Sequence, residues 1–448
     1  MQPVVSITES NAPKITGENL PLKVAVVGTG IRGRFAYSPF AKQRPDLMKL
    51  VAGADINPTR LKGWAKDYGV PENMLFESGE EFFKQPKMAD VVIIATMDRD
   101  HYGHAIAALE KGYDVLLEKP ISPVPEEFFE IAATAKRLGR KVAICHVLRY
   151  SMFFRLLKFY IDSGRIGDLV DIQHIETVGY WHQAHSFVRG NWGNADKSSP
   201  MIMQKCCHDM DILYWLAGCE CKSVSSYGSL KHFRPEGAPP GATERCLDCP
   251  AKAGCQYDAE KIYVKKYYGC VGNGMWPTSA LTDDDVNLTN VYKALREGPY
   301  GKCVYHTDNN VVDHQVVNMQ FDHEITAQLT MVAFSETMSR TIRVFGTRGE
   351  IFGDMEKNEI VVRTFGQPEE HINVADYTSD FSGHAGGDNV MMEEFLLDCA
   401  GMGKVDQTLT SVDVSIHSHL MALAAEQSRL NGGMPVSIEE FAEEHNKF

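Results

Sequence analysis

The sequence lacks any long hydrophobic segment and any surplus of basic residues. Within its 448 residues, no apolar run approaches the roughly 20 residues that are needed to cross a bilayer. Residues 1–21 are polar and lack the basic start and apolar middle of a secretory signal, so we expect a tail on a cytoplasmic protein. The net charge of −14 disfavours nucleic acid as a partner, because phosphates bind basic surfaces.

Internal repeats and low-complexity blocks are also lacking, and the cysteines are unevenly spread. Hydrophobic residues form 44% and charged residues 23% of the chain, the balance of an ordinary globular protein that is long enough for two domains. The 11 cysteines are an odd number, which disfavours a complete disulfide framework. In a cytoplasmic protein, clustered cysteines more often bind metal or fill the core.

A glycine-rich turn lies between a predicted strand and a predicted helix in the first third of the chain. The apolar run 22–27 is typical of a strand buried on both faces, and a helix is compatible with the residues through Lys42. Such a turn lets backbone approach a pyrophosphate, which the N-terminus of the helix attracts. The residues of the predicted dinucleotide site in this turn are Gly28, Thr29, Gly30, Ile31, Arg32 and Gly33.

An acidic residue follows the second predicted strand, 49–54. Asp55 stands where a carboxylate can accept both ribose hydroxyls of an adenosine and would repel a 2′-phosphate. This favours NAD over NADP, although the nearby cation Arg60 softens the discrimination.

Strands and helices continue to alternate, which predicts a parallel, doubly wound α/β sheet of the Rossmann type. The expected strands are 90–95, 114–117 and 141–145, with helices 101–111 and 126–138 between them. Ligands of such sheets bind at the carboxyl ends of the strands. The further residues that we expect at the cofactor are Thr96, Asp98, His101, Glu118, Lys119 and His146.

Several motifs together resemble the Gfo/Idh/MocA family of oxidoreductases. They are the glycine turn, Ala95-Thr96-Met97-Asp98 with His101, Glu118-Lys119-Pro120, Ser163 to Leu169, His208-Asp209-Met210-Asp211 and Phe345 to Ile351. The resemblance implies a Rossmann domain and a C-terminal α/β domain with a large, open, mostly antiparallel sheet. It also implies that this sheet packs against a partner's sheet, in a homodimer or homotetramer.

On this basis we divide the chain into a tail and two domains. Residues 22–146 are the predicted NAD-binding domain, and 147–448 are the predicted substrate-binding and oligomerisation domain. A cysteine-rich insertion is expected at about 234–305.

The chemistry of carbinol oxidation selects candidate catalytic residues. A base must take the hydroxyl proton as hydride leaves carbon, and Lys119 with His208 are the expected pair. Many family members place an aspartate four residues before this histidine, but here Gln204 stands there. Lys205 and Asp209 are candidates to orient and charge-stabilise the histidine in place of that aspartate. Asp209 is also a candidate substrate contact.

Other polar and aromatic residues are candidates for the substrate pocket. Arg149 and Tyr150 follow the sixth strand, and Trp192 is either a platform for a sugar ring or a core aromatic. The histidines His182 and His185 suggest contacts to sugar hydroxyls, a metal site or a structural pair, and His384 with Asp388 lie on a glycine-rich turn that could reach the site.

Three cysteines in the insertion, Cys246, Cys249 and Cys255, have the spacing C-x2-C-x5-C. A structural zinc ion takes four thiolate or imidazole ligands. Cys303 is the favoured fourth ligand, with Cys270 and His306 as alternatives, and buried thiols without metal are the competing interpretation. The metal would stabilise the fold of an insertion that has too little apolar surface to fold alone.

These observations favour an NAD-dependent dehydrogenase acting on a sugar, glycoside or cyclic polyol. An alternative is a glycosidase in which transient oxidation of the sugar permits elimination, water addition and re-reduction. A third reading is a non-catalytic NAD-dependent sensor, which the presence of Lys119 and His208 disfavours.

Overall fold

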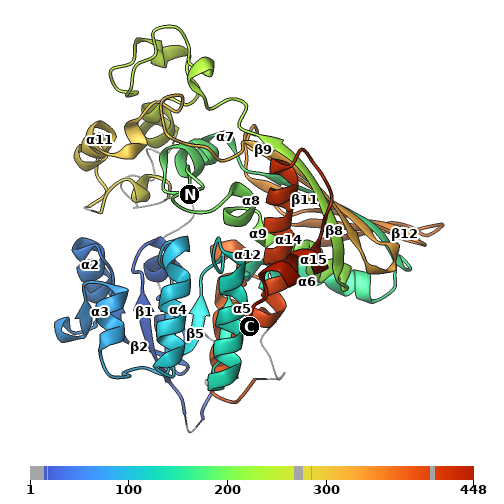
Figure 1. Ribbon diagram of the computed structural model, residues 1–448, viewed down its shortest axis with the longest axis horizontal. Helices are drawn as coiled ribbons and strands as arrows, with labels where there is room; N and C mark the ends of the chain where they lie inside the picture. The colour runs from blue at the N-terminus through green and yellow to red at the C-terminus, as the bar shows by residue number, and fades with distance from the viewer. Residues whose placement is uncertain (1–14, 18, 267–275, 284, 404–408) are drawn as a thin grey trace.

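The chain forms two β-sheets joined by helices, as Figure 1 shows. The computed structural model describes residues 15–17, 19–266, 276–283, 285–403 and 409–448. Most of the predicted tail therefore lies outside the described residues. Among the described helices, none is both long and apolar enough to cross a membrane.

The first sheet has six parallel strands in the order β3-β2-β1-β4-β5-β6, which confirms the predicted Rossmann sheet. Its strands are β1 (Leu22–Val27), β2 (Met48–Ala54), β3 (Leu75–Phe76), β4 (Val91–Ile94), β5 (Asp114–Leu117) and β6 (Val142–Ile144). The strand order reverses between β1 and β4, the point at which such sheets bind ligands. The carboxyl ends of these strands therefore mark the site.

Helices cover both faces of this sheet, and one of them comes from far along the chain. On one face, Val92 packs in a cluster with residues of α4 (His101–Glu110) and α5 (Pro125–Leu138). On the other, Val24 packs with residues of α2 (Pro58–Tyr68) and α13 (Gly387–Cys399). Because α13 belongs to the last fifth of the sequence, the Rossmann sheet is completed only when the C-terminal part folds back onto it.

The helix expected directly after the glycine turn, through Lys42, is interrupted, so that prediction was wrong in its continuity. A single π-helical turn, η1 (Arg32–Tyr37), is followed by the short α1 (Phe40–Gln43). Pro39 cannot donate a backbone hydrogen bond to the preceding turn. The Ser38 hydroxyl donates to the Gly33 carbonyl at 2.6 Å and so occupies an acceptor of the helix start.

The second sheet has nine strands and is mostly antiparallel, as expected; among its described strands only β7 and β10 pair in parallel. The order is β14-β13-β12-β11-β7-β10-β9-β8-β15. The bounds are β7 (Leu169–Thr177), β8 (Cys221–Ser229), β9 (His314–Phe321), β10 (Thr326–Val332), β11 (Ser339–Gly346), β12 (Gly349–Asp354), β13 (Glu359–Thr364), β14 (Glu370–Asn373) and β15 (Val436–Ser437).

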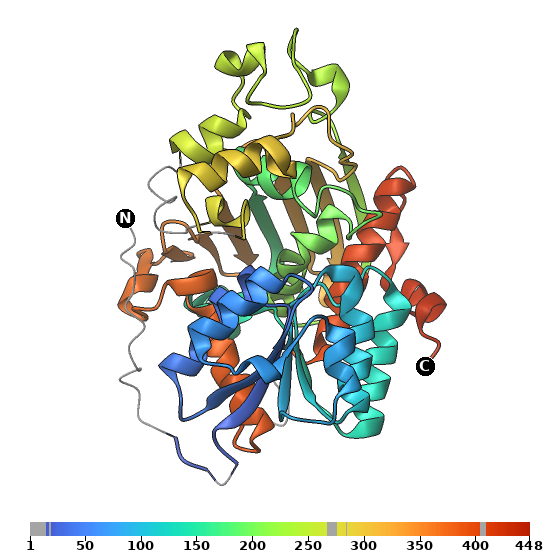
Figure 2. The same ribbon diagram turned by 90° about the vertical axis from the view of Figure 1, so that its left-hand side faces the viewer.

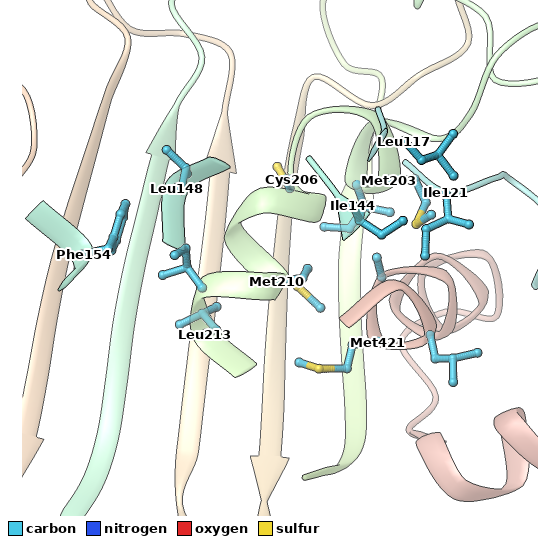
Figure 3. Packing of buried hydrophobic residues seen from close by; sticks show 14 of the residues in the cluster. Leu117, Ile121, Ile144, Leu148, Phe154, Met203, Cys206, Met210, Leu213 and Met421 are labelled. Carbon is cyan, nitrogen blue, oxygen red and sulfur yellow. The ribbon is translucent and has the colours of Figure 1, made fainter. Parts of the chain in front are cut away.

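A hydrophobic core continues from one sheet to the other. Figure 3 shows Leu117 and Ile144 of the parallel sheet in the same cluster as Met210 and Met421. These methionines come from α9 (Cys207–Ala217) and α14 (Val412–Leu430), which lie beside the nine-stranded sheet. The shared core fixes the relative position of the two sheets, and therefore of the polar residues between them.

The last long helix begins earlier than the sequence indicated. The sequence predicts a final amphipathic helix from Ser418 through Leu430. Helix α14 instead starts at Val412, six residues earlier, because the Ser411 hydroxyl caps it by accepting from the Val414 N–H. It is followed by another helix, α15 (Ile438–His445), which the sequence analysis did not predict. The remaining α-helices of the described residues are α3 (Gly79–Lys84), α6 (Met152–Asp162), α7 (Tyr180–His182), α8 (Met201–Gln204), α11 (Leu288–Glu297) and α12 (Ser382–Ala385).

The insertion between β8 and β9 lies above the parallel sheet in both views (Figures 1 and 2). It has its own hydrophobic cluster, in which Tyr257, Ile262, Val291 and Leu295 are buried. Turn η5 (Gln183–Arg189) contributes to that cluster. The insertion therefore does not form this core alone, because neighbouring segments complete it.

Candidate active site

The glycine turn after β1 has the geometry that a dinucleotide needs. Gly28 has φ +95°, and a Cβ there would meet the Ala95 carbonyl oxygen at 2.4 Å, so only glycine fits. A Cβ on Gly33 would lie 2.0 Å from the Gly28 oxygen. At Gly30, by contrast, a Cβ would meet no described atom within 4 Å. The open side of Gly30 leaves room for the close approach of a pyrophosphate, which stays a prediction.

Asp55 lies at the carboxyl end of β2, against the glycine turn. Its Oδ2 accepts hydrogen bonds from the Thr29 N–H at 2.7 Å and the Thr29 hydroxyl at 3.0 Å. Its Oδ1 accepts from the Asn57 N–H at 2.8 Å. These bonds hold the carboxylate at the place where the sequence analysis expected an adenosine ribose.

Arg60 forms an ion pair with a residue of the insertion that the sequence analysis missed. The Arg60 Nε lies 2.5 Å from Oδ1 of Asp283, and the Asn57 side-chain amide donates to Oδ2 of the same carboxylate at 2.7 Å. Because Asp283 neutralises this guanidinium, Arg60 is not a free cation that could attract a 2′-phosphate. The charge of Arg60 is thus offset by Asp283, in addition to the nearby Asp55.

A charged network connects the glycine turn with β5 and α13. The Arg32 guanidinium lies 2.5 Å from Oε1 of Glu118 and 2.7 Å from Oδ1 of Asp388, and it donates to the Tyr37 hydroxyl at 2.6 Å. Burial alone would protonate Glu118, but Arg32 and Lys119 outweigh it and lower the pKa of its carboxyl. Glu118 is therefore held as an anion beside the predicted catalytic lysine.

Lys119 follows Glu118 at the end of β5. Its Nζ donates to the backbone carbonyl of Gln204 at 2.7 Å, which joins the dinucleotide sheet to α8. The turn after Lys119 is fixed by His101, whose Nδ1 lies 2.7 Å from the Pro120 carbonyl. An ammonium has three N–H donors, so Lys119 keeps donors for a substrate oxygen.

His208, on α9, lies in a group of histidines with Lys119. Its ring centroid is 5.9 Å from that of His146 and 5.6 Å from that of His384. Burial, followed by the charges of Lys119 and His384, holds the pKa of His208 well below the ordinary 6.5. Within the described part of the chain, its Nδ1 has no hydrogen-bond partner. His208 is therefore a neutral imidazole at neutral pH.

His146 lies behind His208 and is completely buried. Burial and the Arg149 charge hold its pKa well below 6.5, and neither ring nitrogen has a hydrogen-bond partner among the described residues. Two neutral, incompletely bonded imidazoles thus stand next to the lysine, which is unusual for a purely structural core.

His384 and Asp388 reach this site from the turn before α13. The His384 Nδ1 lies 3.2 Å from Oδ2 of Asp388, and the same carboxylate binds Arg32. A chain of contacts therefore runs from His208 through His384 to Asp388. The sequence marked both residues, but only the packing of α13 on the Rossmann sheet brings them here.

Lys205 and Asp209, the candidates to replace the missing aspartate, belong to a buried ion-pair network instead of contacting His208. The Lys205 Nζ lies 2.7 Å from Oε1 of Glu176, and Arg340 bridges Glu176 at 3.0 Å and Asp209 at 2.7 Å. The His174 Nε2 contacts Asp209 at 2.8 Å. Burial opposes ionisation of Asp209, but Arg340 and His174 hold the pKa of its carboxyl well below the usual range.

Arg149 and Tyr150, expected near the substrate, are buried and already paired. Arg149 holds the Asp211 carboxylate through two bonds, at 2.7 Å and 2.6 Å. The Tyr150 hydroxyl lies 3.1 Å from the Thr410 hydroxyl. In this structure these two side chains brace the segments that carry the site.

Trp192 lies at the edge of the site, with its ring half-buried. Its Nε1 donates to Oδ1 of Asp98 at 3.3 Å, and the Ser199 hydroxyl donates to the other oxygen of the same carboxylate. Thr96, two residues before Asp98, has its hydroxyl 3.2 Å from Nδ1 of His104. The predicted cofactor and sugar contacts of this loop thus meet at Asp98.

The histidine pair, His182 and His185, lies among the aromatic side chains of the insertion. The His185 ring stacks on Tyr300 with centroids 4.7 Å apart, and its Nδ1 lies 3.0 Å from the Tyr263 hydroxyl. Burial lowers the pKa of His185 to about 3. These contacts agree with the structural interpretation of the pair.

The four cysteines of the predicted zinc site line one cavity of about 20 Å³. Throughout the described ranges, however, no group of three or more His, Cys, Asp or Glu side chains is arranged to hold a metal ion. Of the two alternative ligands, Cys270 lies outside the described residues, and His306 is 3.4 Å from Glu244.

Known proteins of similar sequence and fold agree with this geometry. A putative oxidoreductase of Bacillus subtilis, YteT, is 24% identical over 83% of this chain and 88% of its own. The D-glucoside 3-dehydrogenase of Escherichia coli is 30% identical over 33% of this chain and 41% of its own, and inositol 2-dehydrogenase 1 of Saccharopolyspora erythraea is 26% identical over 56% and 69%.

Solved structures share the fold at low identity. An inositol dehydrogenase homologue from Azotobacter vinelandii, solved with NAD+, superposes with a TM-score of 0.66 at 15% identity, covering 96% of this chain and 99% of that one.

Two family models match the chain. The model of the NAD-binding Rossmann fold of this oxidoreductase family matches residues 22–146, and that of its C-terminal α/β domain matches residues 158–438. Together they span most of the sequence and agree with the two sheets and the glycine turn described above. The chain is therefore an NAD-binding oxidoreductase of the Gfo/Idh/MocA family.

Proposed function

We propose that the protein oxidises a carbinol of a sugar, a glycoside or a cyclic polyol, with NAD as hydride acceptor. The observation that carries the proposal is the position of Lys119, which follows β5, donates to the carbonyl of Gln204 four residues before His208, and by its charge lowers the pKa of that imidazole. The names of two relatives, a glucoside dehydrogenase and an inositol dehydrogenase, support the substrate class.

In this proposal each group of residues has a distinct role in binding or in proton transfer. NAD, when bound, supplies the acceptor for the hydride, and the glycine turn with Asp55 would hold its pyrophosphate and adenosine ribose. A free N–H of Lys119 donates to the substrate oxygen. His208, being neutral, accepts the hydroxyl proton, and the Asp388 carboxylate, which contacts His384, stabilises the positive charge that forms there.

Glu118 and the Lys205 network act as positioning groups. Arg32 holds Glu118 as an anion next to Lys119, which keeps the ammonium oriented. Arg340 holds β7 and the start of α9 together through Glu176 and Asp209, which fixes the backbone that carries His208.

We further propose that residues 22–146 bind the dinucleotide and that 147–448 bind the substrate and assemble the oligomer. Trp192, half-buried at Asp98, is the proposed platform for a sugar ring. Assembly as a homodimer or homotetramer and a cytoplasmic location stay predictions.

Replacement of Lys119 by alanine tests the function. With a panel of glycosides and cyclic polyols, we expect NADH formation by the wild type and a loss of about 10²–10⁴-fold in kcat for Lys119→Ala. The dissociation constant of NAD should stay within about twofold, since Lys119 acts on the substrate oxygen. Lys111→Ala, which removes an exposed lysine, is the matched control. Full turnover by Lys119→Ala would refute the mechanism.

A second candidate is a glycosidase that returns the hydride to the sugar after elimination and water addition. Two observations favour it: Gln204 replaces a carboxylate, and Asp283 ties the insertion to Asn57 and Arg60 beside the nucleotide site, which would retain the cofactor. Incubation with glycosides and no added NAD distinguishes the two. Catalytic release of the aglycone without net NADH supports the glycosidase, and NADH formed in proportion to added NAD and substrate supports the dehydrogenase.

A further inference from the structure

The tip of the insertion gathers four thiols around one small cavity. Cys246, Cys249, Cys255 and Cys303 all line it, together with Arg189. Its volume of about 20 Å³ is just above what a single water-sized sphere occupies. Residues more than 50 positions apart in the sequence therefore converge on a space of the size of one ion.

The backbone explains how Cys246 and Cys303 come together. Arg245 and Lys302 form an antiparallel β-bridge. The Cys246 N–H donates to Gly301, and the Cys303 N–H to Glu244, both at 2.9 Å. Successive side chains of an extended chain point to opposite sides. Both thiols therefore leave the bridge on the same side, away from Arg245 and Lys302.

The other two thiols are brought back by tight turns. The Cys249 N–H donates to the Cys246 carbonyl at 3.2 Å. The helical turn 250–254 then ends at Cys255, whose N–H donates to the Lys252 carbonyl at 3.2 Å. The C-x2-C-x5-C spacing is thus the spacing of two turns that both open onto the cavity.

Arg189 gives an independent indication of negative charge in this cavity. It is 4% exposed, and its Nη2 donates to the Cys246 sulfur at 3.2 Å and to the Tyr257 carbonyl at 2.6 Å. Its Nη1 has no hydrogen-bond partner, and no ion pair with a carboxylate is formed, Asp258 at the cavity wall included, as far as the described chain extends. A buried guanidinium normally requires an anionic partner.

We propose that the four thiols bind one zinc ion as thiolates. Each thiol loses its proton to solvent as a zinc–sulfur bond forms, which leaves zinc with four sulfur ligands and a net charge of two negative units. Arg189 supplies one compensating positive charge, and Lys252, also at the cavity wall but 3.5 Å from the Glu260 carboxylate, supplies part of a second. Because the thiols are not yet arranged to hold an ion, binding includes rotation of their side chains toward the cavity.

The role of the ion follows from the packing of the insertion. Its apolar cluster is already formed by Tyr257, Ile262 and Leu295, so zinc is not needed in place of a core. It would instead lock the tip, residues 246–255, onto Cys303, where the chain returns toward β9. The metal is thus structural and lies outside the redox site.

Metal content of the full-length protein tests this proposal without reference to activity. After purification from zinc-supplemented medium and dialysis against a weak chelator, we expect about one zinc per chain by elemental analysis. Replacement of zinc by cobalt should give intense thiolate-to-cobalt charge-transfer absorption. Cys249→Ser and Cys255→Ser should each retain well under one zinc, whereas Cys219→Ser, a control outside the cavity, should keep it.

Three outcomes would contradict the proposal of a zinc site. Wild-type protein that holds well under one zinc after loading, or whose four thiols react with a thiol reagent at the same rate with and without zinc, would overturn the proposal. Disulfide bonds among these cysteines would overturn it as well. Thermal melting of each variant separates loss of metal from loss of fold, because a variant that melts cooperatively but lacks zinc supports the site.

Discussion

Replacing Asp283 by asparagine should let the protein accept NADP more readily. Asp283 belongs to the insertion, but its carboxylate holds Arg60 at 2.5 Å beside the predicted ribose site. The substitution keeps the shape of the side chain and one oxygen that can accept from the Asn57 amide. It removes the negative charge and replaces the oxygen that accepts from Arg60 by an NH2 group, which cannot accept. Arg60 then becomes a free guanidinium next to the place where a 2′-phosphate would lie.

The magnitude follows from two contributions. The Arg60–Asp283 pair is partly exposed, with side chains 45% and 35% accessible, so its loss costs only about 0–1 kcal/mol. A hydrogen bond between a guanidinium and a phosphate contributes about 1.5–3 kcal/mol. The net gain for NADP is therefore about 1–2 kcal/mol, which corresponds to a decrease of about 5- to 30-fold in its Kd.

Calorimetric titration of both dinucleotides measures this directly. The Kd of NADP should fall by the stated factor in Asp283→Asn, while the Kd of NAD changes by less than about twofold, since Asp55 is untouched. Asp285→Asn removes the same charge from the same segment, and in the described structure Arg60 pairs with Asp283 and not with Asp285. An unchanged Kd for NADP, or an equal change in Asp285→Asn, would refute the reasoning.

Three further variants test the packing around the site. Gly33→Ala places a Cβ 2.0 Å from a backbone oxygen, so the Kd of NAD should rise by at least about tenfold, measured by titration. Among the described residues, Arg340→Met leaves the buried Asp209 with only His174 and the buried Glu176 with only Lys205 as partners, and should lower the free energy of unfolding in urea by about 3–5 kcal/mol. Arg343→Met, on the exposed face of the same strand, should change little. Burial lowers the pKa of His419 to about 3, so protonation favours the unfolded chain and stability falls as pH drops below about 6.5, by up to about 1.4 kcal/mol per pH unit. His419→Gln should flatten that part of the stability profile and the exposed His371→Gln should not; an equal slope in both would contradict the assignment.

Local sequence patterns predicted the Rossmann sheet well, because strand and helix periods are short-range properties. The predicted strand 114–117 and the predicted helix 126–138 agree with β5 and α5 to within one residue at either end. The family resemblance added the mostly antiparallel sheet, which no periodicity would have arranged into its nine-stranded order. The first helix and the start of α14 were placed wrongly, since Ser38 and Ser411 act through single hydrogen bonds.

The sequence by itself determined the chemistry that is available at the site: a glycine turn that only glycine can form, an acid after β2, and a lysine after β5. These features depend on residues that are adjacent in the chain, so they can be interpreted before the fold is known. It also marked His208, His384 and the four cysteines as residues that carry chemistry.

Only the tertiary structure decided which of these residues meet. Packing of α13 on the Rossmann sheet brought Asp388 to Arg32, 356 positions away in the chain. The Asp209 carboxylate pairs with Arg340 instead of His208. The insertion folds back toward the Rossmann domain, and this places Asp283 beside Arg60. Each contact joins segments far apart in the sequence, and its formation depends on burial of apolar surface elsewhere, which no local pattern encodes.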